Sequence, residues 1–230
     1  MTRPFDVGLP LELAFRRDGR FAIELLDPVT LERVFDGVRV SADGLRRSTP
    51  YINTSGMFVW LNEDVTRLQK IAIDPRALPY DTLELLPAQL NLSASSSRVT
   101  TIELPPRTDY PFSAGTTAAR GTLLEDRSTP PVPVQDAGIH LRWLDDDGVT
   151  WRDASTVSRT NARGDFAAVL RLAPADTPRI DAHGALTIRV HARRANGRER
   201  TSADLQIAQG RVADPSTTSA LTLAWDDMQP

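Results

Sequence analysis

The chain has 230 residues, of which 40% are hydrophobic and 25% are charged, so it has enough apolar side chains for the core of one large or two ordinary domains. Its 27 basic and 30 acidic residues leave a net charge of −3, and this balance argues against a surface for nucleic acid or anionic lipid. The sequence contains no cysteine, which excludes disulfides, thiolate metal sites and cysteine nucleophiles.

No run of apolar residues approaches the roughly 18 residues that a membrane-spanning helix needs, so we expect no membrane span. The residues from Met1 to Asp6 lack the apolar region of a secretory signal peptide. We therefore expect synthesis in the cytoplasm without a signal peptide, followed by incorporation into a particle.

Short stretches in which apolar and polar residues alternate follow one another along the first half of the chain, and a period of two is typical of half-buried strands. Asp18-Gly19 separates the first two stretches and predicts a tight hairpin between them. Gly, Pro, Asn and Asp separate the others. The strands expected here are 11–15, 21–25, 38–40, 57–60, 68–73, 83–85, 89–92 and 99–104.

Two prolines, Pro105 and Pro106, end this first set of strands, because proline cannot sit in a central strand. No stretch keeps a helical period over several turns, so at most one short helix is expected. The later strands are expected at 119–124, 139–143, 166–172, 186–190, 205–207 and 221–225. The domains predicted from this pattern are a first β-sandwich at 1–104, a proline-rich linker at 105–115 and a second β-sandwich at 116–230.

The two halves share an ordered set of signals: a strand, an acidic turn, a second strand, and then Asn-x-x-Gly-x-Phe leading into a third. The hexapeptide spans Asn53–Phe58 in the first half and Asn161–Phe166 in the second. Asn tolerates the turn, Gly supplies a positive φ, and Phe begins the next core strand. This order resembles the carboxypeptidase regulatory-like domain, a transthyretin-like relative of the Ig-like folds, over roughly 9–104 and again over 116–225.

The resemblance implies an all-β protein of two tandem Ig-like/transthyretin-like β-sandwich domains. Domains of this group are mostly non-catalytic modules attached to enzymes, adhesins or assemblies, and one sandwich hosts many roles. The join Asp109–Thr117, between two such modules, is also similar to small accessory proteins of phage-tail-like contractile particles. That second resemblance implies docking on other proteins of an assembly, and it leaves the partner and the oligomeric state open.

The residues that could act in catalysis or bind a metal do not form a known catalytic or metal-binding motif. His140 and His191 fall on the outward phase of their strands and His183 lies in a turn, without the spacing of convergent zinc ligands. The sequence contains neither Gly-x-Ser-x-Gly nor Ser-x-x-Lys. We therefore predict that the chain is not an enzyme and has no catalytic residues, metal site or cofactor. The acidic turn Asp145–Gly148 lacks the spacing of an EF-hand. Two interpretations of this turn remain, a solvated turn and an irregular calcium-binding loop.

Two groups of residues are candidates for partner contact. The hairpin 189–200 holds five arginines against Glu199, which predicts a basic lobe for an acidic partner. It lacks the interleaved aromatic side chains that stack on bases, so nucleic acid is not expected there. Two tryptophans are candidates for a carbohydrate-binding platform. The predicted contact residues are Arg189, Arg193, Arg194, Arg198, Arg200, Trp60 and Trp151.

The leading hypothesis is a non-enzymatic structural or interaction module that docks within a larger protein assembly, with a phage-tail-like contractile particle as that assembly. The alternative is a carbohydrate- or cell-surface-binding accessory module that uses the tryptophans. The proline-rich join favours the first hypothesis, because a stiff two-domain rod holds two binding surfaces at a fixed spacing.

Overall fold

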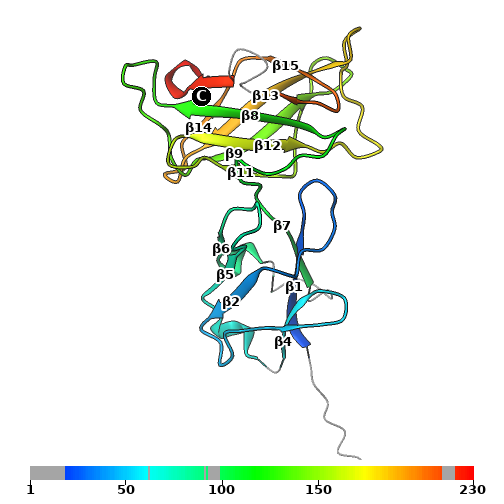
Figure 1. The fold of residues 1–230 in the computed structure, drawn as a ribbon, viewed down its shortest axis with the longest axis vertical. Helices are drawn as coiled ribbons and strands as arrows, with labels where there is room; N and C mark the ends of the chain where they lie inside the picture. The colour runs from blue at the N-terminus through cyan, green and yellow to red at the C-terminus, as the bar shows by residue number, and fades with distance from the viewer. Residues whose placement is uncertain (1–18, 62, 91, 93–98, 214–220) are drawn as a thin grey trace, which may run out of the picture.

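A computed structural model of the chain describes residues 19–61, 63–90, 92, 99–213 and 221–230. Every regular element in this part of the chain is a β-strand or a short 3₁₀ helix. The strands form four sheets, which pair into two β-sandwiches placed one after the other along the long axis of the molecule (Figure 1). The predicted all-β sandwich class is thereby confirmed.

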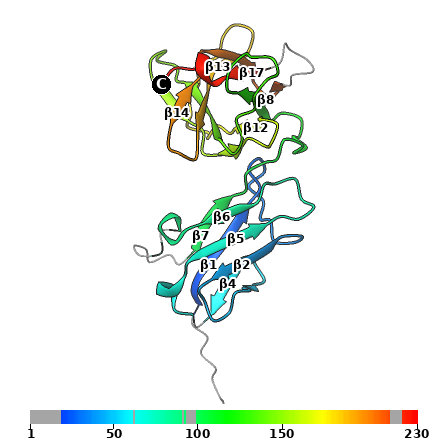
Figure 2. The same ribbon diagram turned by 90° about the vertical axis from the view of Figure 1, so that its left-hand side faces the viewer.

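The first sandwich packs a four-stranded sheet against a three-stranded sheet (Figure 2). Alternate residues enter the core between them, so that Phe21, Ile23 and Leu25 of one sheet share a cluster with Ile71 and Ile73 of the other. The four-stranded sheet runs β3 (Tyr51–Ile52), β4 (Phe58–Leu61), β1 (Gly19–Leu26) and β7 (Val99–Glu103), and the three-stranded sheet runs β2 (Arg39–Asp43), β5 (Lys70–Asp74) and β6 (Leu83–Leu85). The loops contain η1 (Val65–Arg67) and η2 (Pro87–Gln89).

The second sandwich packs a six-stranded sheet against a four-stranded sheet. The six-stranded sheet runs β10 (Trp151–Asp153), β9 (Gly138–Leu144), β13 (Ala185–Arg193) and β14 (Glu199–Thr201), with β11 (Ser158–Arg159) also on β9 and β15 (Leu205–Ala208) also on β13. The four-stranded sheet runs β12 (Asp165–Leu170), β8 (Thr117–Leu124) and β16 (Val212–Ala213), with β17 (Leu221–Ala224) also on β8 and followed by η3 (Trp225–Asp227).

The two sandwiches repeat one pattern of strand pairing. In the first, β1 pairs antiparallel with β4 and parallel with β7. In the second, β8 pairs antiparallel with β12 and parallel with β17. The facing sheets agree as well, because β2 and β9 pair antiparallel with β5 and β13 respectively. The repeat in the sequence is therefore a repeat of topology.

The shared hexapeptide forms the same turn in both copies. The side-chain oxygen of Asn53 accepts from two backbone N–H groups of its turn, and so does that of Asn161. Gly56 and Gly164 both have positive φ, +77° and +79°. A Cβ on Gly164 would lie 2.3 Å from the carbonyl oxygen of Leu123. The turn therefore needs glycine for its backbone conformation and, in the second copy, for space.

One expectation about a single strand needs correction, and another is untested. The predicted hairpin at Asp18-Gly19 and the strand predicted at 11–15 fall outside the described residues, which begin at Gly19. The strand predicted at 89–92 is wrong at its start, where η2 leads into the buried Leu90.

Each sandwich has its own hydrophobic cluster, and the two clusters share no residue. Tyr110 and Phe112, which fall in the predicted linker, belong to the first cluster. Pro105 and Pro106 are buried as well. The boundaries at 104 and 116 stay a prediction, but the segment between them is packed against the first sandwich rather than free.

Asp27, the residue after β1, is a buried carboxylate that ties this segment down. It accepts hydrogen bonds from the hydroxyls of Tyr80 at 2.7 Å and Tyr110 at 2.5 Å, and from the backbone N–H groups of Val29 and Thr30 at 2.8 and 2.7 Å. Burial by itself would raise the pKa of Asp27, but these donors outweigh burial and hold the pKa below its usual value. The group is therefore ionised in the folded protein and joins three separate parts of the chain.

We expect Asp27→Ala to lower the free energy of unfolding by about 3 kcal/mol, because two buried hydroxyls and two backbone donors lose their acceptor. Urea unfolding followed by tryptophan fluorescence measures the change. The control is Asp43→Ala, an exposed carboxylate whose ion pair with Lys70 is long, at 3.8 Å, and should shift stability by less than about 1 kcal/mol. Equal losses in the two variants would contradict the role given to Asp27.

Candidate functional site

The outward face of the six-stranded sheet, here called the outer face, brings together several residues predicted to contact a partner. The antiparallel pairing of β9 with β13 places Arg142 directly opposite Arg189, and His140 directly opposite His191. These side chains point outward because the residues between them along each strand are buried in the core. The outward phase predicted for the two histidines agrees with this burial pattern.

Arg189 and Trp151 form one composite feature of the outer face. The guanidinium carbon of Arg189 lies 4.0 Å from the centroid of the Trp151 ring, a cation–π contact, and its Nε lies 2.7 Å from a carboxylate oxygen of Asp204. On the neighbouring strand, Nε of Arg142 lies 2.7 Å from a carboxylate oxygen of Asp153. One face of the Trp151 indole is therefore covered by the guanidinium of Arg189, which makes that face unavailable to a sugar.

The imidazole rings of the two histidines of the outer face lie against each other in a tilted arrangement, with centroids 4.6 Å apart and an angle of 37° between the ring planes. Nε2 of His140 lies 3.4 Å from Asp153, and Nε2 of His191 lies 3.6 Å from Glu199. Burial is the largest cause that lowers the pKa of both imidazoles. The neighbouring His191 lowers the pKa of His140 further, and the guanidinium groups of Arg142 and Arg193 lower that of His191, while the carboxylates oppose the effect. Both rings are therefore neutral at neutral pH.

Three of the other predicted arginines are engaged within their own sandwich. Arg193 pairs with Glu199 at 3.3 Å. Arg194 pairs with Glu125 and stacks 4.0 Å from the Trp225 ring, while Arg200 donates to the carbonyl of Met228 at 2.9 Å. Arg198, at the tip of the hairpin, is exposed. The predicted basic lobe is thus largely compensated by carboxylates that sequence order does not place beside it.

The prediction that Trp60 contacts a partner is wrong. The side chain is 1% exposed and stacks face to face on Phe21, with ring centroids 4.6 Å apart. Trp60 lies in β4, on the same inward phase as Phe58. It is therefore part of the first core and is unavailable to sugars or proteins.

A groove of about 630 Å³ lies at the edge of the outer face and reaches the first sandwich. His140, His191 and Arg159 line it from the second sandwich, and Gln89 of η2 lines it from the first. Sequence analysis could not foresee this groove, because Gln89 and Arg159 are far apart in the chain.

The joint between the sandwiches centres on Arg171 and Glu103, two residues that sequence analysis missed. One guanidinium nitrogen of Arg171 donates to Glu103 at 2.5 Å and to the hydroxyl of Ser155 at 3.0 Å, and another donates to the carbonyl of Pro28 at 3.0 Å. The second carboxylate oxygen of Glu103 accepts from the hydroxyl of Thr156 at 2.8 Å. Glu103 and Pro28 belong to the first sandwich, and the other three residues belong to the second.

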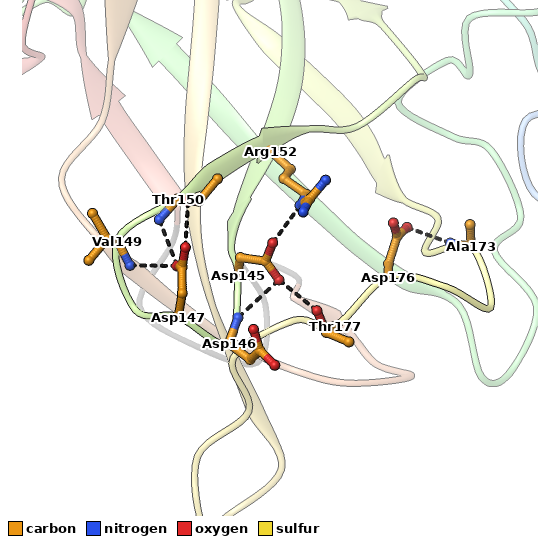
Figure 3. A network of polar contacts seen from close by, with 9 residues as sticks. All are labelled: Asp145, Asp146, Asp147, Val149, Thr150, Arg152, Ala173, Asp176 and Thr177. Carbon is orange, nitrogen blue, oxygen red and sulfur yellow. Dashed lines mark hydrogen bonds and ion pairs between the residues drawn. The ribbon is translucent and has the colours of Figure 1, made fainter.

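The acidic turn after β9 is held by its own donors (Figure 3). Asp145 accepts from Arg152 at 2.6 Å and from the hydroxyl of Thr177 at 2.8 Å. Asp147 accepts from two backbone N–H groups and from the hydroxyl of Thr150, bonds that lower its pKa to about 2. No group of three His, Cys, Asp or Glu in the described ranges has the arrangement of a metal site. The carboxylates of Asp145 and Asp147 are therefore engaged by donors of the protein itself.

No protein-family model matches the chain, and no curated protein matches it either. A structure that it resembles is a mutant of the shaft pilin SpaA from Lactobacillus rhamnosus GG, with 11% sequence identity over 86% of this chain and 96% of the pilin chain. The TM-score is 0.24, so the likeness does not bear on function. Among the described residues no helix has the length and apolar character to cross a membrane.

We expect protonation of His140 and His191 to lower the stability of the folded protein as the pH drops below about 6.5, the ordinary pKa of histidine. Burial raises the pKa of Asp81 to about 6, and its protonation opposes this change, so the effect of the two histidines is read from the comparison of variants. Because His140 and His191 have lowered pKa values in the folded state, the unfolded chain takes up protons that the folded chain resists, and unfolding is favoured. Urea midpoints between pH 7 and pH 5 measure this slope.

The double variant His140→Gln/His191→Gln should show a shallower slope, and His183→Gln, in an exposed turn, should keep the slope of the parent protein. Proton NMR titration of the imidazoles gives a direct check. A midpoint at or above 6.5 for both rings of the pair would contradict the argument.

Proposed function

We propose that the chain is a non-catalytic structural module that holds two β-sandwiches in a fixed arrangement and docks through them on other proteins of a larger assembly. The observation that carries this proposal is the joint built by Arg171 and Glu103. Both side chains are mostly buried, with 27% and 22% exposure, so their ion pair is shielded from solvent more than a surface pair is.

The connecting segment adds a second link to the joint. Arg120, in β8, donates to the carbonyl of Tyr110 at 2.6 Å, and Tyr110 in turn donates to Asp27. Tyr110, in the middle of the segment, is therefore held by a charged group of each sandwich, and Pro105 and Pro106 before it are buried. Two sandwiches joined in this way hold their binding surfaces at a set distance, which suits a spacer or adaptor in an assembly.

The outer face is the surface we assign to docking. It carries a half-buried arginine and tryptophan, two residue types that dominate binding energy in protein interfaces, in the composite of Arg189 and Trp151. The assembly we propose is a phage-tail-like contractile particle, a choice that rests on the sequence of the join Asp109–Thr117. We further propose that the chain is made in the cytoplasm and is then built into the particle.

The fixed joint is tested by a distance measurement across it. The chain has no cysteine, so spin labels on Gln69→Cys and Val149→Cys, both exposed positions, report only the distance between the sandwiches. We expect a narrow distance distribution that broadens in Arg171→Ala, because the guanidinium makes three of the contacts across or beside the joint. Arg163→Ala, an exposed arginine away from it, should leave the distribution narrow. A broad distribution in the parent protein would overturn the proposal.

Docking is tested by fractionation of particles from cells that make the tagged chain. We expect the chain to sediment with the particles, and a photo-crosslinker placed at position 198 to attach it to one particle protein. Position 163, on another loop, serves as the control position. Recovery of the chain in the soluble fraction, without crosslinks from position 198, would contradict docking through the outer face.

A further inference from the structure

The tip of the hairpin between β13 and β14 carries Asn196-Gly197, and Asn196 is the only asparagine in the sequence that a glycine follows. Both residues are exposed. Gly197 has a φ of +82°, and a Cβ built on it would meet no other atom within 4 Å. Water therefore has open access to the peptide bond between these two residues.

The turn at this tip holds the side-chain amide of Asn196 near the backbone that follows it. The backbone N–H of Arg198 donates to the side-chain oxygen of Asn196 at 3.0 Å. This hydrogen bond closes a ring that contains the backbone nitrogen of Gly197, so it keeps the amide carbon Cγ of Asn196 close to that nitrogen. A donor on the amide oxygen also stabilises the negative charge that appears there when Cγ is attacked.

One further hydrogen bond of the turn restrains the attacking atom. The N–H of Gly197 donates to the carbonyl of Arg194 at 2.9 Å. The residues at the tip are exposed and lie outside both hydrophobic clusters, and hydrogen bonds in such places open readily without unfolding of the domain. This bond therefore slows a reaction at the tip but does not prevent it.

Two other asparagines provide references within the same molecule. Asn53 and Asn161 each accept the same hydrogen bond, from the backbone N–H two residues on, at 3.0 and 2.8 Å. Each also accepts a second bond, from four residues on, and the residues that follow them are Thr54 and Ala162. A Cβ next to the attacking nitrogen hinders its approach to the amide, and glycine has none.

We propose that Asn196 deamidates spontaneously in the folded protein. The backbone nitrogen of Gly197 gives up its proton to hydroxide and attacks Cγ of Asn196, so that a bond forms between the nitrogen and Cγ. The bond between Cγ and Nδ2 breaks, and Nδ2 takes up a proton from water and leaves as ammonia. Water then opens the cyclic imide at either carbonyl carbon, which gives aspartate or isoaspartate. One water is consumed and one ammonia is released, without an oxidant or a reductant.

The product changes the charge of the surface that we assign to docking. The hairpin 189–200 holds five arginines and one glutamate, and deamidation adds a second carboxylate at its tip. Arg193, with 67% exposure, and Arg198 lie at the same tip and are exposed. A lower positive charge there weakens attraction to an acidic partner. This consequence rests on the proposed function, whereas the deamidation itself does not.

Peptide mapping by mass spectrometry tests the reaction on the full chain, incubated at pH 8 and at pH 6. We expect the mass increase of an amide converted to a carboxylic acid at position 196, growing with time and faster at pH 8, because the nitrogen must lose its proton. Asn53 and Asn161 should stay unchanged over the same time. Gly197→Ala should slow the reaction at position 196, and Asn53→Gln should leave its rate as in the parent protein. No product at position 196, or equal rates at the three asparagines, would overturn the proposal.

The consequence for docking is tested with Asn196→Asp, which carries the charge of the product from the start. We expect fewer crosslinks from position 198 to the particle protein than in the parent chain. Asn53→Asp adds the same charge to a turn of the first sandwich and should crosslink like the parent. Equal crosslinking in all three would overturn the effect of the charge, while absence of the parent chain from the particles would instead contradict the proposed function.

Discussion

The carboxylate of Asp27 is the point on which the arrangement of the two sandwiches depends. It lies where β1 ends, and it collects the hydroxyls of Tyr80 and Tyr110 from the loop before β6 and from the connecting segment. The carbonyl oxygen of the adjacent residue, Pro28, accepts a hydrogen bond from Arg171 of the second sandwich. A single ionised group therefore fixes the turn, the connecting segment and one side of the joint. Buried charges are retained only where several donors compensate the loss of water, and Asp27 meets that condition.

Much of the fold follows from interactions between residues close in sequence, and these can be recognised in the sequence itself. The period of two in Phe21, Ile23 and Leu25 separates core from surface, and these residues are buried as the pattern predicts. Asn53 and Asn161 mark the same turn in both halves. The side-chain oxygen of the asparagine accepts from N–H groups of its own turn and a glycine at positive φ follows, so the turn depends only on residues close in sequence. Such features need only neighbouring residues, and they are the ones that sequence analysis finds.

Contacts between distant residues could not be found in this way. Arg171 and Glu103 are 68 positions apart, and no periodicity links a cation after β12 to a carboxylate at the end of β7. Trp60 and Trp151 look alike in sequence, yet one completes the first core and the other lies under Arg189. The charge of the predicted basic lobe is largely compensated for the same reason, because Glu125 and Asp204 come beside its arginines only once the strands have paired.

The pairing of β1 with β7 has a mechanical consequence. Within the first sandwich the chain path runs in through β1 and out through β7, and these strands are parallel neighbours over Ala22–Leu26 and Val99–Glu103. A pull along the chain between Gly19 and Leu104 therefore slides one strand along the other and loads their hydrogen bonds together rather than one after another. The second sandwich has the same geometry, with β8 beside a parallel β17. In each sandwich the hydrogen bonds between the two parallel strands would therefore bear a pulling force at the same time, which makes the unit resistant to unfolding under tension.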